Sequence, residues 1–127
     1  MSWELGGSAP VFLQIAEHIR ADIVSGRYGP GEQIPPVRQL ATEASVNPNT
    51  MQRALGILES EGLLISEGTV GRFVCSNRAV IDGAAEKQKR RIIDTLICEA
   101  GRLGISEREM VEHLERRIRE RGENGGE

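Results

Sequence analysis

A run of neutral polar side chains lies near the middle of the chain, in the stretch VNPNTMQRAL. Asn47, Asn49, Thr50 and Gln52 can each donate a hydrogen bond, and Arg53 is the only residue of the stretch with a formal charge. The apolar residues that follow at spacings of three and four predict a helix that begins here. Because the dipole and free N–H groups at a helix N-terminus attract anions, a first turn without acids predicts an end that a phosphate can approach.

These residues also have a purely structural interpretation. Asn47 is a preferred N-cap residue and Pro48 is favoured at the first position of any helix. Taken alone, Arg38 is an ordinary surface arginine, and Gly71 serves a turn. The binding interpretation therefore depends on how the elements that carry these residues are combined.

Hydrophobic periodicity predicts those elements. Helices are expected within residues 9–27, 37–45 and 49–62, separated by the turn-rich segments YGPGEQIPP and VNP. Two short strands are expected around residues 63–65 and 70–74, with a tight turn between them. A helix–turn–helix followed by a hairpin is the winged-helix arrangement, in which the second helix of the motif enters the major groove of DNA.

The chain after residue 77 consists mainly of helix formers and predicts two further helices. We expect a winged-helix domain over residues 1–77 and a two-helix tail over residues 78–127, in a mostly α fold with a small β-hairpin. Each tail helix has one apolar stripe, which needs a partner surface on the first domain, on a second copy of the chain, or on both. The residues expected to form a homodimer are Ile92, Leu96, Leu103, Met110, Val111, Leu114 and Ile118.

Composition excludes several classes of protein. No apolar run is long enough to span a membrane and no signal peptide is recognisable, so we expect a cytoplasmic protein without membrane contact. No catalytic constellation or metal-ligand spacing involves the histidines or the isolated Cys75 and Cys98, which predicts neither an enzyme nor a metal or cofactor site. The net charge of -3 weighs against a nucleic-acid partner, so DNA binding would depend on where the few arginines lie.

Several phrases together resemble the GntR family of bacterial transcription regulators, and the short tail resembles its YtrA subfamily. The phrases are GRYGPGEQIPPVRQLA, VNPNTMQRA, LESEGL and GRFV, in this order between residues 26 and 74. The resemblance implies a homodimer on an inverted-repeat operator of double-stranded DNA, usually a repressor of its own operon, which often encodes an ABC transporter. The residues expected to contact DNA are Arg38, Asn47, Pro48, Asn49, Thr50, Gln52, Arg53, Gly71 and Arg72.

Two questions stay open at the level of sequence. A winged helix can instead serve as a protein–protein interaction module, and the negative charge keeps this alternative in place. The tail leaves room for a small-molecule effector, but no residue cluster identifies one. The densest basic run is Lys87, Lys89, Arg90 and Arg91, which is either a solvated helix face or a site for an anion or for DNA.

Overall fold

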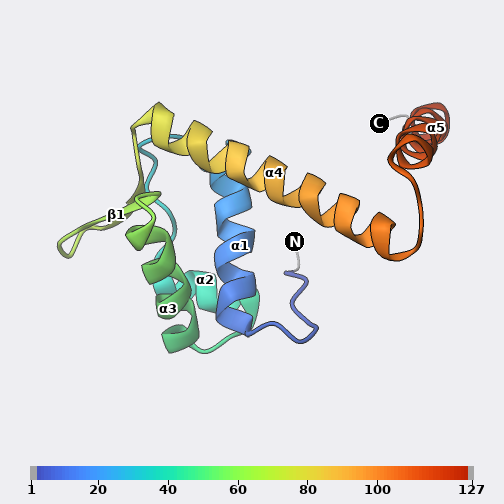
Figure 1. Cartoon of the computed structure of the whole chain (residues 1–127). Helices are drawn as coiled ribbons and strands as arrows, with labels where there is room; N and C mark the ends of the chain where they lie inside the picture. Colours follow the sequence, from blue (N-terminus) through green and yellow to red (C-terminus); the bar gives the residue numbers. More distant parts are fainter. Residues whose placement is uncertain (1–2, 126–127) are drawn as a thin grey trace. The chain divides into compact units, whose positions relative to one another are not determined.

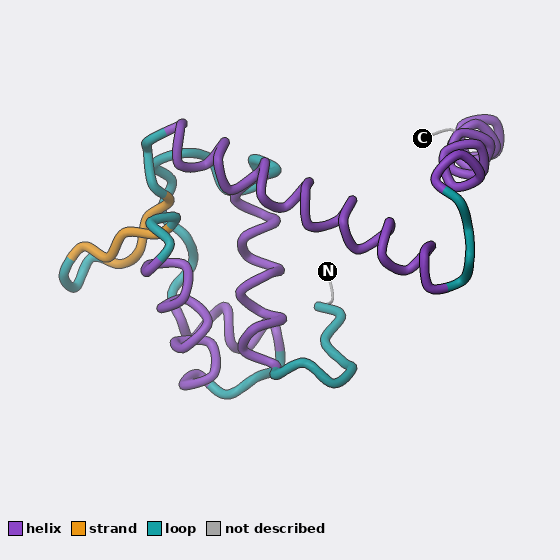
Figure 2. The backbone as a smooth tube through the Cα atoms, viewed as in Figure 1, coloured by secondary structure: helices purple, strands orange, loops and turns teal. Residues whose placement is uncertain are grey.

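The computed structural model describes residues 3–125, which contain five helices and one two-stranded antiparallel sheet (Figures 1 and 2). The expected fold class is confirmed: three helices precede a hairpin, and two helices follow it. The elements are α1 (Val11–Val24), α2 (Val37–Ala44), α3 (Pro48–Ser60), β1 (Leu64–Glu67), β2 (Gly71–Val74), α4 (Arg78–Arg102) and α5 (Glu107–Gly125).

The core lies where α1, α2 and α3 meet. Ile15, Ile19 and Ile23 recur every four residues along α1, so they lie on one face of the helix and are buried together. Leu55 and Leu58 of α3 are also completely buried, and α3 packs against both α1 and α2. Burial of these side chains holds α3 in place and leaves its opposite face to solvent.

The turn between α2 and α3 directs the start of α3 outward. Ser45 ends α2 in the left-handed conformation, with φ of 58°, and the Val46 amide donates to the Ala41 carbonyl at 3.0 Å. Asn47 then caps α3, because its side-chain oxygen accepts a hydrogen bond from the Asn49 amide at 2.7 Å. The N-cap predicted from the sequence is therefore confirmed.

The hairpin forms the wing, and Figure 1 shows it extending away from the three helices. Its register pairs Leu64 with Val74 and Glu67 with Gly71. The connector after α1 runs along the other side of β2: the Val74 amide donates to the Glu32 carbonyl at 2.8 Å, and the Ile34 amide donates to the Arg72 carbonyl at 3.0 Å. β2 is thus fixed on both edges, whereas β1 is fixed on one.

The chain divides into two compact units, residues 1–86 and 87–127. The division falls inside α4, whereas the sequence places a boundary at residue 77, just before this helix. Ile81 is buried in the core of the first unit, so the first turns of α4 belong with the winged helix. In the second unit, Ala100 is the only buried residue among residues 87–123.

Candidate nucleic-acid interface

The first turn of α3 is open to solvent and carries no acidic residue. Asn47, Asn49, Gln52 and Arg53 are exposed, and Thr50 is half-buried. Pro48, also exposed, occupies the first helical position. The positive end of the helix dipole therefore faces solvent through neutral donors, which is the arrangement that an approaching anion requires.

Two arginines near this end of α3 have different surroundings. Arg38, at the start of α2, is exposed and has no hydrogen bond or ion pair with any residue between 3 and 125. The Arg53 guanidinium lies over the ring of Phe12, 3.8 Å from the ring centroid. A cation over an aromatic face keeps its charge while its position is restricted, so Arg53 is held against α1 and Arg38 is free to reach outward.

Arg72 of the wing points back to the recognition helix. Its Nε donates to the Glu59 carboxylate at 2.8 Å, and one terminal nitrogen donates to the Gln52 side-chain oxygen at 3.1 Å. Sequence reasoning singled out Gln52 and Arg72 separately and missed Glu59. The available signal was spacing: Glu59 follows Gln52 by seven residues, which places both on one face of α3.

Gly71 is required at the first position of β2. Its φ of 138° is a conformation that other residues rarely adopt. A Cβ added to Gly71 would lie only 2.7 Å from the side-chain amide nitrogen of Gln33. The Gln33 side chain donates to the Val70 carbonyl at 2.9 Å and so fixes the end of the wing turn. Sequence reasoning identified Gly71 but not its contact with Gln33.

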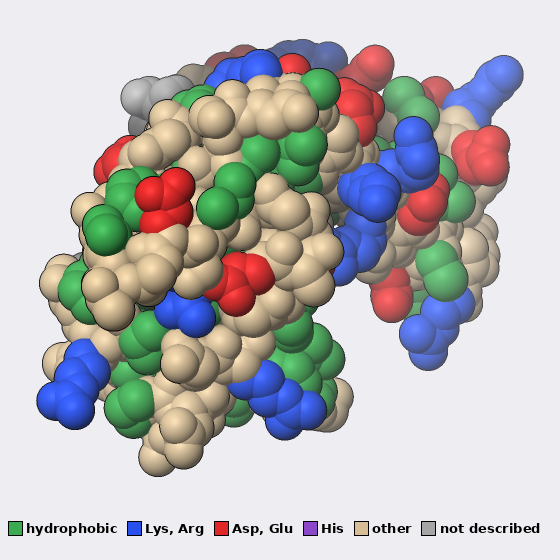
Figure 3. All heavy atoms as spheres, turned by 90° about the vertical axis from the view of Figure 1, so that its left-hand side faces the viewer, with side chains coloured by type: hydrophobic (Ala, Val, Ile, Leu, Met, Phe, Trp, Pro, Cys, Tyr) green, Lys and Arg blue, Asp and Glu red, His purple; other side chains and the backbone are tan. Residues whose placement is uncertain are grey.

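Figure 3 views the molecule from the side on which the wing projects in Figure 1. Some basic side chains on this face stand apart, with neutral surface and a few acidic groups between them, and others lie next to one another toward the right of the view.

The second unit exposes the apolar residues that the sequence assigns to a dimer interface. Leu103 is 78% exposed, Ile92 66% and Leu114 43%, whereas Met110 is half-buried. Leu96, Val111 and Ile118 are also exposed, and so are Ile93 and Ile97, which sequence reasoning missed. An apolar groove of about 470 Å³ lies between α4 and α5, lined by residues that include Leu96, Leu103, Met110 and Leu114.

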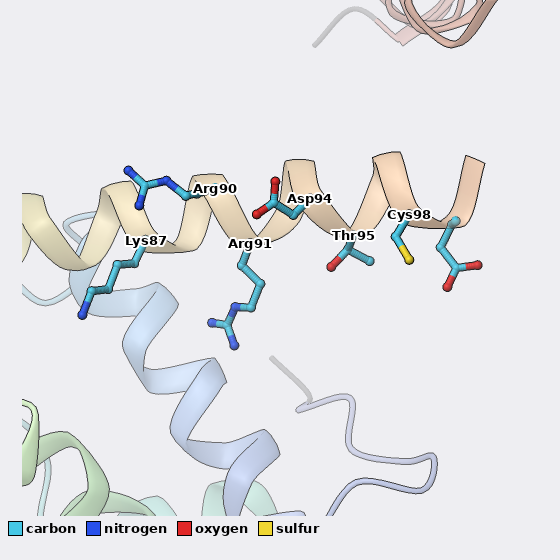
Figure 4. Close-up of a pocket in the computed structure, with 7 residues that line it drawn as sticks. Lys87, Arg90, Arg91, Asp94, Thr95 and Cys98 are labelled. Carbon is cyan, nitrogen blue, oxygen red and sulfur yellow. The ribbon is translucent and has the colours of Figure 1, made fainter. Parts of the chain in front are cut away.

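The basic run of the sequence lies on α4 beside a shallow pocket of about 430 Å³ (Figure 4). Lys87 and Arg91 extend from one side of the helix, and Arg90 extends from the other. Asp94 and the exposed Cys98 also line the pocket. The mixture of charges and the open shape give no selective site for an anion.

A third cavity, of about 340 Å³, lies on the first unit beside α1 and is lined by residues that include Trp3, His18 and Tyr28. Trp3 stacks on the His18 ring with centroids 3.9 Å apart. Burial, with a smaller contribution from Asp22, raises the pKa of Tyr28, so this side chain stays a neutral hydroxyl.

Three further features bear on the sequence analysis. Cys75 is buried and Cys98 is exposed, and both are free thiols. Within residues 3–125, no group of three histidine, cysteine or acidic side chains is arranged to hold a metal ion. No helix in that range has the length and apolar character to cross a membrane.

Comparison with known proteins places these elements in a family. Residues 12–74, from α1 through the wing, match the bacterial regulatory proteins of the gntR family. The HTH-type transcriptional regulator YhcF of Bacillus subtilis is 30% identical over 114 residues, which make up 90% of this chain and 94% of YhcF. The chain belongs to the gntR family of bacterial regulatory proteins. It is a transcriptional regulator with a DNA-binding helix–turn–helix, and it is not an enzyme.

Further relatives resemble this gntR-family chain over most of its length. The HTH-type transcriptional repressor YtrA of Bacillus subtilis is 32% identical over 93 residues, 68% of this chain and 72% of YtrA. A solved GntR family transcriptional regulator from Listeria monocytogenes superimposes with a TM-score of 0.83 and 28% identity, covering 88% of this chain and 98% of that one.

One solved relative was determined with DNA. AraR(DBD) in complex with operator ORX1 superimposes with a TM-score of 0.54 and 30% identity, and covers 59% of this chain and 95% of that one. The match therefore includes nearly all of the AraR DNA-binding domain and slightly more than half of this chain. The tail helices α4 and α5 have their counterpart in the Listeria structure.

Proposed function

We propose that this gntR-family regulator is a repressor that binds an inverted-repeat operator as a homodimer, with each winged helix contacting one half-site. The observation that carries the proposal is the open first turn of α3, which presents neutral donors and the positive end of the helix without any acidic side chain. An acid-free helix end in an acidic chain fits a partner that presents phosphates and hydrogen-bonding base edges, as DNA does.

The proposed DNA surface has three parts. The part on α3 consists of Asn47, Pro48, Asn49, Thr50, Gln52 and Arg53. The flanking elements contribute Arg38 at the start of α2 and Gly71 on the wing, and Arg72 of the wing contributes through its hydrogen bond to Gln52. Arg38 is the residue best suited to a phosphate contact, because its guanidinium is exposed and has no partner within residues 3–125. Gly71 lets the wing backbone approach the duplex without a side chain in between.

The second unit supports the homodimer. Its helices expose apolar side chains along most of their length, and only Ala100 is buried among residues 87–123. Such a surface is costly to leave in water, and a second copy offers the same apolar residues for an isologous interface. Two linked winged helices would also bind two half-sites with greater avidity than one.

The name of the relative YtrA supports repression. Resemblance to its subfamily further suggests that the target is the regulator's own operon and that this operon encodes an ABC transporter. The protein would act in the bacterial cytoplasm, where the chromosome lies.

Selection of bound sequences from a random pool of double-stranded DNA tests this function directly. The proposal expects an enriched inverted repeat, with an affinity that falls steeply as salt rises because phosphate contacts release counterions. Enrichment of a single half-site would contradict the dimer. A folded protein that enriches no sequence would contradict operator binding and favour a protein–protein interaction module.

A further inference from the structure

Two hydrogen bonds connect the wing to the recognition helix α3, and they link the side chains of Glu59, Arg72 and Gln52. Glu59 accepts a hydrogen bond from the Arg72 Nε at 2.8 Å, and Arg72 donates in turn to the Gln52 oxygen at 3.1 Å. Arg72 and Glu59 are both half-buried, whereas Gln52 lies on the exposed face of α3. The contact therefore runs from a sheltered ion pair to a residue at the proposed DNA surface.

The hydrogen bond from Arg72 determines which end of the Gln52 side-chain amide faces outward. A guanidinium has only donors, so the Gln52 atom that meets Arg72 is the amide oxygen. The amide NH₂ group is then the end that remains for DNA. We infer that Glu59 and Arg72 orient Gln52 as a hydrogen-bond donor, so that it reads a base edge made of acceptors; this inference rests on the proposed operator binding.

The donor orientation predicts a base. In the major groove, guanine presents two acceptors, N7 and O6, and thymine presents the O4 acceptor. Adenine is normally read by glutamine through both ends of the amide, with the oxygen accepting from N6 and the NH₂ group donating to N7. Because the bond to Arg72 turns the Gln52 oxygen toward the wing, adenine is disfavoured and guanine or thymine is preferred.

Glu59 has a second consequence for binding. Its carboxylate forms an ion pair with the Arg72 guanidinium, which holds Arg72 against the protein. Arg72 is therefore a positioning residue for Gln52. If Glu59 is neutralised, Arg72 loses its strongest partner and becomes available to a DNA phosphate. Gln52 is then released and can use both ends of its amide.

The test compares base preferences in the random-pool selection for the wild type, Gln52→Ala and Glu59→Gln. Gln52→Ala should remove the preference at one position of each half-site, and the wild type should select guanine or thymine at that position. Glu59→Gln should reduce discrimination against adenine there by about tenfold, the lower part of the range for one bidentate contact. It should also steepen the salt dependence of affinity by about one phosphate contact.

Glu61→Gln is the matched control. Glu61 follows α3 and forms an ion pair with Arg20 at 2.6 Å, so the variant removes the same charge and breaks a similar pair away from Gln52. It should keep the base preference and the salt dependence of the wild type. Circular dichroism melts of all variants establish that each protein is folded under the selection conditions.

Each alternative result overturns the inference. These results are adenine at the Gln52 position in the wild type, no position altered by Gln52→Ala, and an unchanged preference in Glu59→Gln. A change in Glu61→Gln equal to that in Glu59→Gln would also overturn it, because net charge alone would then explain the effect. Failure of the wild type to enrich any sequence would instead contradict the proposed function.

Discussion

The two units of this chain differ in where their apolar side chains lie: most are buried in the first unit, and most are exposed in the second. In residues 1–86, apolar side chains at helical spacing converge from α1, α2, α3 and the wing, and many of them are completely buried. In residues 87–127, similar spacing leaves isoleucines and leucines in solvent. The same type of sequence pattern therefore encodes self-sufficient packing in one unit and an unsatisfied surface in the other.

The contrast separates two uses of amphipathic helices. A helix that packs against neighbours within its own unit gains stability from the folded chain alone. A helix with an exposed apolar stripe gains it only when a partner covers the stripe. We therefore expect mutations in the first unit to alter folding and comparable mutations in the second unit to alter association.

The largest expected effect comes from truncating a leucine in the first core. Leu55 is 0% exposed, so Leu55→Ala should lower the free energy of unfolding by about 2–5 kcal/mol. Leu103→Ala makes the same change at a residue that is 78% exposed. It should alter the free energy of unfolding by less than about 0.5 kcal/mol. Urea titrations at low protein concentration, followed by circular dichroism of the helices in both units, measure both values. Equal losses would remove the distinction between the units.

The next effect concerns association. Leu114→Asp should weaken the homodimer by about 2 kcal/mol or more per copy, because a carboxylate would be buried in an apolar interface. Leu13→Asp is the matched control, since Leu13 is 42% exposed and Leu114 is 43% exposed. Sedimentation velocity over a range of concentrations measures the shift from dimer to monomer. A Leu114→Asp protein that stays dimeric would place the interface elsewhere.

A smaller effect is expected at the wing. Gly71→Ala should lower the free energy of unfolding by about 1–3 kcal/mol, because the backbone there has a φ of 138° and the new Cβ would meet the Gln33 amide. Gly68→Ala is the control: it also has a positive φ, of 52°, but a Cβ there meets no atom within 4 Å. Thermal denaturation should rank Gly71→Ala as clearly less stable, and the reverse order would show that Gln33 does not constrain the turn.

The sequence could predict what depends on local periodicity. Helical spacing placed α1 to α5, and the Asn47–Pro48 pair located the start of α3, because caps and apolar faces are encoded within a few residues. The division of the chain inside α4 was not predictable in this way. Helix propensity is continuous there, and only the burial of Ile81 against distant residues ties the first turns to the first unit.

The candidate site was predictable to a similar extent. Asn49 and Gln52 could be placed on the open end of α3 from their positions alone. Their partners could not, because Arg72 reaches Gln52 from a residue 20 positions away, and Arg53 meets Phe12 on another helix. Contacts between elements depend on how the elements pack, which no local pattern records. The orientation of the Gln52 side chain therefore follows only from the three-dimensional structure, because Arg72 lies on another element.

The smallest effect tests which unit carries DNA contacts. Arg38→Ala should weaken binding to the selected operator by about 1 kcal/mol and lower the salt slope by about one contact, with little change in sequence preference, because a phosphate contact is not sequence-specific. Arg90→Ala makes the same change in the exposed basic run on α4 and should leave both values unchanged. Fluorescence anisotropy titrations at several salt concentrations provide both measurements. Equal losses for the two variants would extend the DNA surface to the second unit, and the contrast between a unit for DNA and a unit for association would then fail.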